Sequence, residues 1–386
     1  MMWRSLASNV LTLLIIGLFL VGGLVLWGQE SYRAEGPLEA PICLRVERGS
    51  NMTRVSKSLV DQGAVSSEKL FRIGADYAGK SADLKAGSFL VPEGASMEEI
   101  VEQITRGGAS TCGTEVVYRI GVTRITAQVT TYDPAEGGFV VAAEFDPTEG
   151  TALPQEYSAA REESDTRYRM VVAEGTTSWQ VVEGLKAMDM LDGTIAEVPD
   201  EGMLAPDSYE VVNGGERQAL LDEMEAVQLL RVGAAWEGRS ADVPVDSPEE
   251  LLILASIIEK ETGVPEERGQ VASVFANRLE RGMRLQTDPT VIYGITQGEG
   301  VLGRGLRQSE LRRATPWNTY VIIGLPPTPI ANPGMASLEA AASPQATDYL
   351  FFVADGSGGH AFATTLDEHN ANVAKWRQIE AERAGN

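Results

Sequence analysis

The sequence is poor in the residues that bind metal ions and nucleic acids. Its 386 residues include only two cysteines and two histidines, too few for a zinc site made of those side chains. Lys and Arg number 32 against 55 Asp and Glu, a formal net charge of −23, and no stretch rich in Lys or Arg occurs. Because an acidic chain repels a polyphosphate, nucleic acid is a poor candidate partner. Carboxylates are the reactive groups that remain plentiful.

Long hydrophobic runs are also scarce, and only one is long enough to cross a membrane. From Val10 to Trp27 no residue carries a charge, and as a helix this run would be about 27 Å long, close to the ~30 Å hydrocarbon core of a bilayer. Trp3 and Trp27 flank it, where interfacial indoles commonly lie. A cleavable signal peptide is the alternative, but the run exceeds a usual signal core and no A-x-A pattern precedes Gln29. We expect an uncleaved single-pass anchor over residues 10–28.

The charges around this run predict its orientation. Arg4 precedes it, whereas Glu30, Arg33 and Glu35 follow it. The positive-inside rule then favours a short cytoplasmic stub at residues 1–9, with the rest of the chain exported.

Export would make the two cysteines a candidate disulfide. Cys43 and Cys112 lie in the exported part, and an oxidising compartment lets such a pair bridge. Two unrelated buried thiols are the alternative.

Residues 40–106 alternate between strand-like and helix-like patterns. We expect a strand ending at Val46, helices over 53–61 and 67–77, a strand over 85–91 and a helix over 97–104. This β-α-α-β order resembles a LysM-like module, a fold that holds N-acetylated glycan strands.

Residues 107–165 change in character. The stretches 116–118, 124–131 and 138–144 alternate in a strand-like way and are separated by Asp-Pro turns. Residues 153–167 are polar and loop-like. We expect a small β-rich insertion or linker with no chemistry of its own.

The strongest candidate for chemistry is a glutamate on an apolar helix. Residues 251–263, LLILASIIEKETG, predict this helix, and on a helical wheel Glu261 falls on its most apolar stripe. Glu259 lies about 200° away. A carboxyl on an apolar stripe loses hydration, which raises its pKa, as the general acid of a glycosidase requires at neutral pH. The alternative for Glu261 is a purely structural ion pair with Arg268, Arg278 or Arg281.

The segment after the next helix is suited to hold a sugar. Residues 268–281 predict a second amphipathic helix, and MRLQTDPTVIYG follows it. We expect Gln286, Thr287, Asp288 and Pro289 to form a buried loop beside Tyr293, which would combine hydrogen-bonding groups with an aromatic face. An Asp-Pro turn that begins a third helix is the alternative.

Four segments carry a family resemblance. ASIIEKETG (255–263), VASVFANRLERGMRLQTDPTVIYG (271–294), WNTYVIIGLPPTPIANPG (317–334) and YLFFVADGSGGHAF (349–362) together resemble the endolytic murein transglycosylase (YceG-like) family. The resemblance extends from Gln29 to the C-terminus and is strongest over 204–370. It implies a membrane-anchored cell-envelope lyase that cuts within peptidoglycan strands. It also implies that the second glutamate of E-K-E-T, Glu261, is catalytic. Residues 107–165 depart from it, because they are longer than the family's usual connection.

A single acid predicts a lytic rather than a hydrolytic mechanism. Hydrolytic glycosidases use two carboxylates about 5–10 Å apart, but Glu259 and Glu261 point to nearly opposite sides of their helix. We expect Glu261 to protonate the β-1,4 oxygen that leaves N-acetylmuramic acid. The carboxylate then takes the proton of the sugar's C6 hydroxyl, which closes a 1,6-anhydro ring. No water, metal or cofactor is needed.

Six residues are candidates for holding the glycan, and each has a structural alternative. Asn318 and Tyr320 could instead pin the loop before Val321, and Asn332 could cap a helix near Gly334. Glu259 is expected to have a supporting or surface role. The full set of candidate contacts is Gln286, Asp288, Tyr293, Asn318, Tyr320 and Asn332.

Together these expectations describe an α+β protein with one transmembrane helix, a LysM-like module, a β-rich insertion and an α+β catalytic domain over residues 166–386. The chain would lie in the cell inner membrane with its catalytic domain in the periplasm. Its expected partners are peptidoglycan glycan strands and, from the resemblance, peptidoglycan synthases of wall growth. Two alternatives stay open: a non-catalytic envelope scaffold that binds glycan, and a true hydrolase that uses Asp288 as its second carboxylate.

Overall fold

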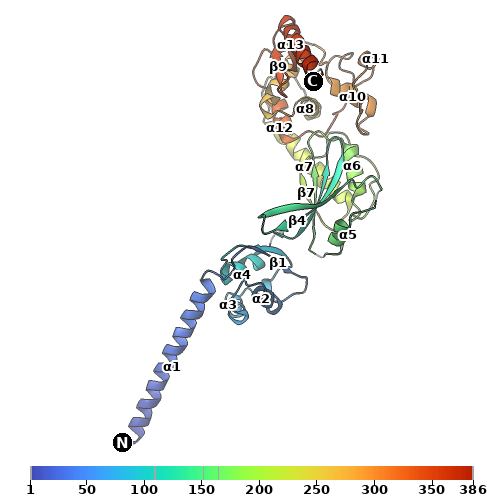
Figure 1. Cartoon of the computed structure of the whole chain (residues 1–386). Coiled ribbons are helices and arrows are strands. Elements are labelled where there is room, and N and C mark those ends of the chain that lie inside the picture. The colour runs from blue at the N-terminus through green and yellow to red at the C-terminus, as the bar shows by residue number, and fades with distance from the viewer. Residues whose placement is uncertain (1, 108–109, 151, 164, 385–386) are drawn as a thin grey trace. The chain divides into compact units, whose positions relative to one another are not determined.

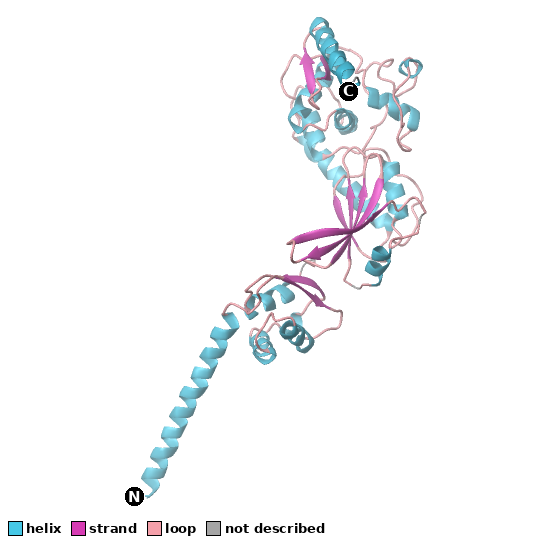
Figure 2. Cartoon of the chain, viewed as in Figure 1, coloured by secondary structure: helices cyan, strands magenta, loops and turns pink. Residues whose placement is uncertain are grey.

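The computed structural model describes residues 2–107, 110–150, 152–163 and 165–384 (Figure 1). The chain divides into two compact units. The first comprises Met1–Val116, Gln128–Glu144 and Leu153–Arg167, and the second comprises Val117–Ala127, Phe145–Ala152 and Tyr168–Asn386. Figure 2 shows helices and strands in both units, as expected for an α+β protein.

The first element is a long apolar helix, α1 (Met2–Arg33). An 18-residue stretch within its segment Leu11–Arg33 has a mean hydropathy of 2.4, and no residue of that stretch is buried inside the protein. By length and composition α1 could cross a membrane, and a signal sequence would pass the same test. The side chains of Trp3 and Arg4 lie outside the described residues.

A small module follows α1, with the element order that the sequence predicts. Strand β1 pairs antiparallel with β2, with Leu44 opposite Phe89. Asn51, Ser67 and Ser96 cap the three α-helices, and Ser96 forms the reciprocal capping box with Glu99. The elements are β1 (Ile42–Val46), α2 (Met52–Asp61), α3 (Glu68–Tyr77), a 3-10 turn (Ser81–Asp83), β2 (Gly87–Val91) and α4 (Met97–Arg106).

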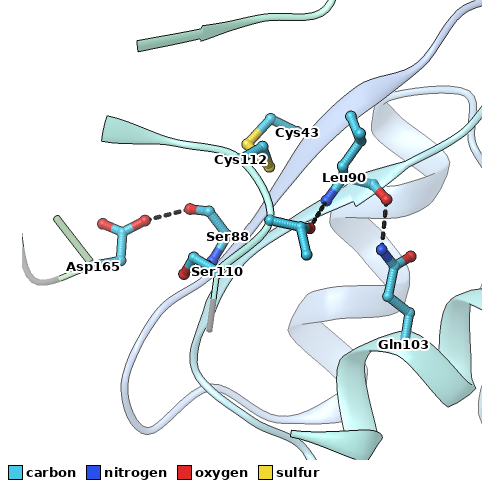
Figure 3. The surroundings of a disulfide bond; sticks show 8 residues. Cys43, Ser88, Leu90, Gln103, Ser110, Cys112 and Asp165 are labelled. Carbon is cyan, nitrogen blue, oxygen red and sulfur yellow. Dashed lines mark hydrogen bonds between the residues drawn. A yellow bond between two sulfur atoms is a disulfide. The ribbon is translucent and has the colours of Figure 1, made fainter. Parts of the chain in front are cut away.

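A disulfide joins Cys43 to Cys112, with 5.8 Å between the two Cα atoms (Figure 3). The strand next to it is held by side chains as well. The Leu90 amide donates to Thr111 Oγ1 at 2.7 Å, and Gln103 donates to the Leu90 carbonyl at 2.6 Å. These bonds satisfy backbone groups of β2 that the two-stranded sheet leaves unpaired.

A five-stranded sheet follows, in the order β5-β4-β3-β6-β7. The predicted insertion supplies three of these strands, so the boundary expected at residue 165 falls within a sheet. Residues 153–167 are not all loop as expected: they contain α5 (Gln155–Glu162), which buries Tyr157 and Ala160. The short helix was missed because only two of its eight residues face the core. The strands are β3 (Thr114–Ile120), β4 (Ile125–Asp133), β5 (Gly138–Phe145), β6 (Arg167–Val172) and β7 (Ser208–Val211).

The C-terminal region is built around helix α8 (Pro248–Glu261). Every residue from Leu251 to Ile258 is buried, and α7, α9 and α12 pack against the helix. Figure 1 shows α8 nearly end-on among its neighbours. The surrounding elements are α6 (Ser178–Ala187), α7 (Arg217–Glu237), a 3-10 turn (Pro265–Glu267), α9 (Arg268–Glu280), α10 (Asp288–Thr296), α11 (Gln308–Leu311), α12 (Met335–Ala342), β8 (Phe351–Ala354), β9 (His360–Ala363) and α13 (Leu366–Ala384).

Candidate active site

Glu261 is the last residue of α8 and is only partly exposed. The Thr287 hydroxyl donates to its Oε1. Burial raises the pKa of Glu261 above its usual value, and the nearby negative charge of Asp288 raises it further. The Thr287 hydrogen bond and the positive charges of His360 and Arg278 act in the opposite direction.

The reason given in the sequence analysis for this burial was wrong in part. Helix α8 has no single apolar stripe, because Ala255 and Ser256 are as buried as Leu254 and Ile258. Burial surrounds the helix up to Ile258, and Glu261 stands where the helix leaves that core. The raised pKa therefore comes from the end of a central helix and not from one face of an amphipathic one.

The ion-pair alternative for Glu261 is not found in the described part of the chain. Arg278, the arginine that acts on its pKa, donates instead to the carbonyls of Leu350 and Leu285, at 2.7 and 2.5 Å. Glu261 therefore keeps a hydroxyl as its hydrogen-bonding partner and no arginine.

A loop and the start of α10 face Glu261. Thr287 is buried, whereas Gln286 and Asp288 are exposed, so the buried loop expected from the sequence was wrong in part. Helix α10 begins at Asp288, as the Asp-Pro alternative predicted. Gln286 has a φ of 51°, a left-handed conformation that costs a residue with a Cβ about 1–2 kcal/mol. This places an exposed amide next to the residue that holds Glu261.

Thr319 holds this loop in place through its hydroxyl and its carbonyl. Its hydroxyl accepts from the Thr287 amide at 3.1 Å and lies 2.8 Å from the Thr290 hydroxyl. Its carbonyl accepts from the Gln286 amide at 3.2 Å. All three threonines are at most 3% exposed. Thr319 was not predicted from the sequence, because a threonine between two candidate residues carries no signal of its own.

Asp288 and Tyr320 form a pair beside the acid. The Tyr320 hydroxyl donates to Asp288 Oδ1 at 2.7 Å. Burial raises the pKa of Tyr320, and the bond to Asp288 and the charges of Asp288 and Glu261 raise it further. Asp288 and Tyr320 thus place polar groups close enough to Glu261 to interact with its charge.

The direct glycan contacts expected of Asn318 and Asn332 are corrected by the structure, because both residues are fully buried. The Asn318 amide donates to three carbonyls between residues 310 and 313, and its oxygen accepts from the Tyr320 amide. Asn332 accepts from the Leu204 amide at 2.9 Å and donates to the Thr176 carbonyl at 3.1 Å. Both asparagines fix backbone and have no exposed polar group for a ligand.

Tyr293 also has a structural partner that the sequence analysis missed. Its hydroxyl hydrogen-bonds the Glu201 carboxyl, and its ring lies 5.8 Å from that of Trp317. Glu201 accepts from the Ser178 amide at 2.8 Å, and burial raises its pKa. Glu201 lies in an irregular segment, PDEGML, where no periodicity indicates which side chain turns inward.

Glu259 lies on another side of α8 from Glu261. Its Oε2 accepts from the Gly334 amide at 3.0 Å, at the start of α12. Burial raises the pKa of the neighbouring Glu174, and the charge of Glu259 raises it further. The position of Glu259 at a helix N-terminus fits the supporting role expected of it.

The sequence matches the YceG-like family over residues 44–375. A protein of Bacillus subtilis (strain 168) named endolytic murein transglycosylase is 28% identical over 366 residues, which are 92% of this chain and 91% of that protein. A protein of the same name from Streptococcus pneumoniae (strain D39) is 26% identical over 344 residues, 86% of this chain but 58% of that longer protein. The crystal structure of a YceG-like protein from Listeria monocytogenes matches with a TM-score of 0.44 and 24% identity, over 86% of this chain and 99% of that one. Because the family match covers most of the sequence, the chain belongs to the YceG-like family.

Proposed function

We propose that this protein is an endolytic peptidoglycan lytic transglycosylase with Glu261 as its acid and base. The observation that carries the proposal is the environment of Glu261: a carboxyl with a raised pKa, held at one oxygen by Thr287 and close to the exposed carboxyl of Asp288. The names of the two relatives point to the same activity.

In the proposed reaction, protonated Glu261 donates its proton to the β-1,4 oxygen between N-acetylmuramic acid and N-acetylglucosamine. The C1–O4 bond breaks, and the positive charge that develops at C1 is stabilised by the carboxylate left behind. That carboxylate then takes the proton of the C6 hydroxyl, and O6 bonds to C1 to close the 1,6-anhydro ring. Glu261 ends protonated again, so neither water nor a cofactor is consumed.

Some of the neighbouring residues would hold the glycan, and others hold the catalytic acid. Thr287 fixes Oε1 of Glu261, which leaves Oε2 to move the proton. Gln286, Asp288 and Tyr320 would hydrogen-bond the sugar hydroxyl and acetamido groups. Asn318 holds the backbone of Tyr320.

We also propose a location. Helix α1 would cross the cell inner membrane once, with residues 1–9 in the cytoplasm and the catalytic domain in the periplasm, where it would act in wall growth beside peptidoglycan synthases. The exposed apolar surface of α1 and the Cys43–Cys112 disulfide support an exported chain.

The test is mass spectrometry of the fragments that the full-length chain releases from peptidoglycan in detergent. We expect ends that carry 1,6-anhydro-N-acetylmuramic acid. Reducing ends would instead support a hydrolase, for which the nearness of Asp288 to Glu261 is the favouring observation, and Asp288→Asn would then abolish cleavage. Binding without any cleavage would leave the envelope scaffold.

A further inference from the structure

A groove lies on the N-terminal module, and none of the residues that line it belongs to the candidate site. It has a volume of about 700 Å³ and runs between the C-terminal half of α1 and helix α3. Its apolar lining includes Leu24 and Trp27 of α1 and Leu70, Ile73 and Tyr77 of α3. None of these residues has a part in the proposed reaction.

The two sides of this groove are held together tightly. Tyr32, near the end of α1, is 9% exposed and belongs to the core of the module. A Cβ on Gly74 of α3 would overlap the Tyr32 ring, so only glycine lets the helices approach this closely. Arg33 also pairs with Glu98 of α4 at 3.3 Å. The last turn of α1 is therefore attached to the module by the side chains of Tyr32 and Arg33.

The groove side of α3 is unusually apolar for an exposed surface. Ile73 is 64% exposed and Tyr77 84% exposed, and Trp27 across from them is 61% exposed. The opposite side of α3 buries Phe71 and Ala75 in the module core. Both sides of this ten-residue helix are thus apolar, but only one is covered by protein.

The groove also reaches into the apolar run of α1. Leu24 and Val25, which belong to that run, line it together with Ile73 and Tyr77. These two side chains of α3 are therefore level with the last turn of the segment that we propose crosses the membrane. If α1 spans the bilayer, Ile73 and Tyr77 cannot remain in bulk water.

We propose that this groove binds phospholipids of the outer leaflet of the membrane that α1 crosses. An acyl chain would lie along Leu24, Ile73 and Leu70, with Trp27 and Tyr77 at the interface, where such rings are favoured. Lys69 also lines the groove and would face the phosphate groups. The inference rests on the membrane-spanning role proposed for α1. Lipid binding in the groove would place the N-terminal module at the membrane surface.

The continuity of the groove with α1 argues for lipid over another occupant. A protein partner would have to displace the lipid that already surrounds Leu24 and Val25. A second copy of this chain is the main rival, and the experiment separates the two.

The test places an environment-sensitive fluorophore on single cysteines of the full-length chain, with the native disulfide intact, in vesicles containing phosphatidylglycerol. The variants are Ile73→Cys in the groove, Leu18→Cys in the middle of the apolar run, and Ala86→Cys as a matched control. Ala86 is exposed on the same module and lines a different pocket. Lipids with a quencher at the headgroup, the upper acyl chain or the lower acyl chain report the depth of each probe.

We expect the Ile73 probe to lose most of its fluorescence to the shallow quenchers, as for a side chain about 5–10 Å into the interface. The Leu18 probe should respond to the deep quencher and the Ala86 probe to none. Quenching at Leu18 with an Ile73 probe that behaves like Ala86 would overturn the inference and leave the anchor standing. Loss of quenching at Leu18 would overturn the anchor, and the inference with it. A blue shift at Ile73 that grows with protein density without lipid quenching would assign the groove to a second copy.

A pair of charge reversals tests the phosphate contact. With the probe at Ile73, Lys69→Glu should make the probe shallower in anionic vesicles, because a carboxylate is repelled by the headgroups. Lys57→Glu makes the same change on exposed α2 outside the groove and should leave the depth unchanged. Equal effects of the two variants would contradict a specific role for Lys69.

Discussion

The small N-terminal module and the region around α8 differ in what they bury. In the module, the largest fully buried side chains are Phe71, Leu44, Leu59, Ile100 and Ile104, and a disulfide closes the segment that contains them. The region around α8 has an apolar core too, but it also buries the hydroxyls of Thr287, Thr290 and Thr319 and the amides of Asn318 and Asn332. The module is stabilised mainly by hydrophobic burial, whereas the site depends on polar groups that are buried and paired.

This difference shows how the site is organised. An unpaired buried polar group costs about 1–3 kcal/mol, so such groups are retained where their geometry is needed. Each of the five side chains has a hydrogen-bonding partner. Thr287, Thr290, Thr319 and Asn318 fix the loops that carry Gln286, Asp288 and Tyr320, whereas Asn332 joins the backbone at residues 176 and 204. The following changes test whether the residues that act on the substrate are distinct from the buried residues that stabilise the fold. They begin with the largest expected effect.

Glu261→Gln should nearly abolish cleavage and leave the fold intact. The glutamine keeps the volume and can still accept from Thr287, but it has no proton to transfer. General acid–base catalysis contributes about 10²–10⁴-fold, and a single-acid mechanism has no substitute, so we expect a loss in the upper part of that range. The rate of release of soluble glycan fragments measures it.

Glu259→Gln is the matched control for that change. The variant removes a carboxylate from the same turn of α8, while its amide oxygen can still accept from Gly334. We expect near-normal cleavage. Full activity of Glu261→Gln, or equal losses in the two variants, would remove Glu261 from the proposed role.

Removal of the disulfide should destabilise the module far more than the site. The cross-link joins residues separated by 69 positions, and a loop of that size is worth on the order of 4 kcal/mol in the chain-entropy estimate. Replacing both cysteines by serine should lower protection against hydrogen exchange over residues 42–106, with little change around α8. Equal loss in both regions would show that the two cores are not independent.

Asn332→Ala should destabilise the region around α8 although it removes no apolar contact. It leaves the Leu204 amide and the Thr176 carbonyl without their side-chain partner, and we expect a loss of about 1–3 kcal/mol in the free energy of unfolding. Urea unfolding measures it. Gln286→Ala, at an exposed position, should change stability by less than ~0.5 kcal/mol but weaken cleavage. The reverse result would make Asn332 a binding residue after all.

The module was the easier part to predict from the sequence. Short amphipathic helices with Asn51, Ser67 and Ser96 at their starts carry local signals, and the structure confirms those caps. Helix α5 was missed because its apolar positions are few and its polar residues outnumber them. Local patterns thus suffice where each element buries one face.

The site could be predicted only in outline. The choice of Glu261 rested on the sequence motif and on an apolar stripe, but α8 is buried on all sides as far as Ile258, so the stripe by itself does not single out Glu261. Which of several asparagines and tyrosines face solvent depends on how distant loops meet, as the bonds of Asn332 to residues 176 and 204 show. The pattern of residues within one segment does not indicate contacts between loops that are distant in the sequence.

Thr287→Val should have the smallest effect and the most specific one. The change keeps the shape of the side chain and removes the hydroxyl that donates to Glu261, and the loss of one hydrogen bond is worth about 0.5–1.5 kcal/mol. That bond lowers the pKa of Glu261 against the larger effect of burial, so its removal should raise the pKa further. Cleavage requires the protonated acid, and the alkaline side of the pH–rate profile should therefore move to higher pH while the rate at its optimum falls modestly. Thr290→Val, which removes a hydroxyl from the same network without touching Glu261, should lower stability and leave the profile in place. An unchanged alkaline limb in Thr287→Val would mean that Glu261 does not set the pH dependence, and that the buried hydroxyls serve the fold alone.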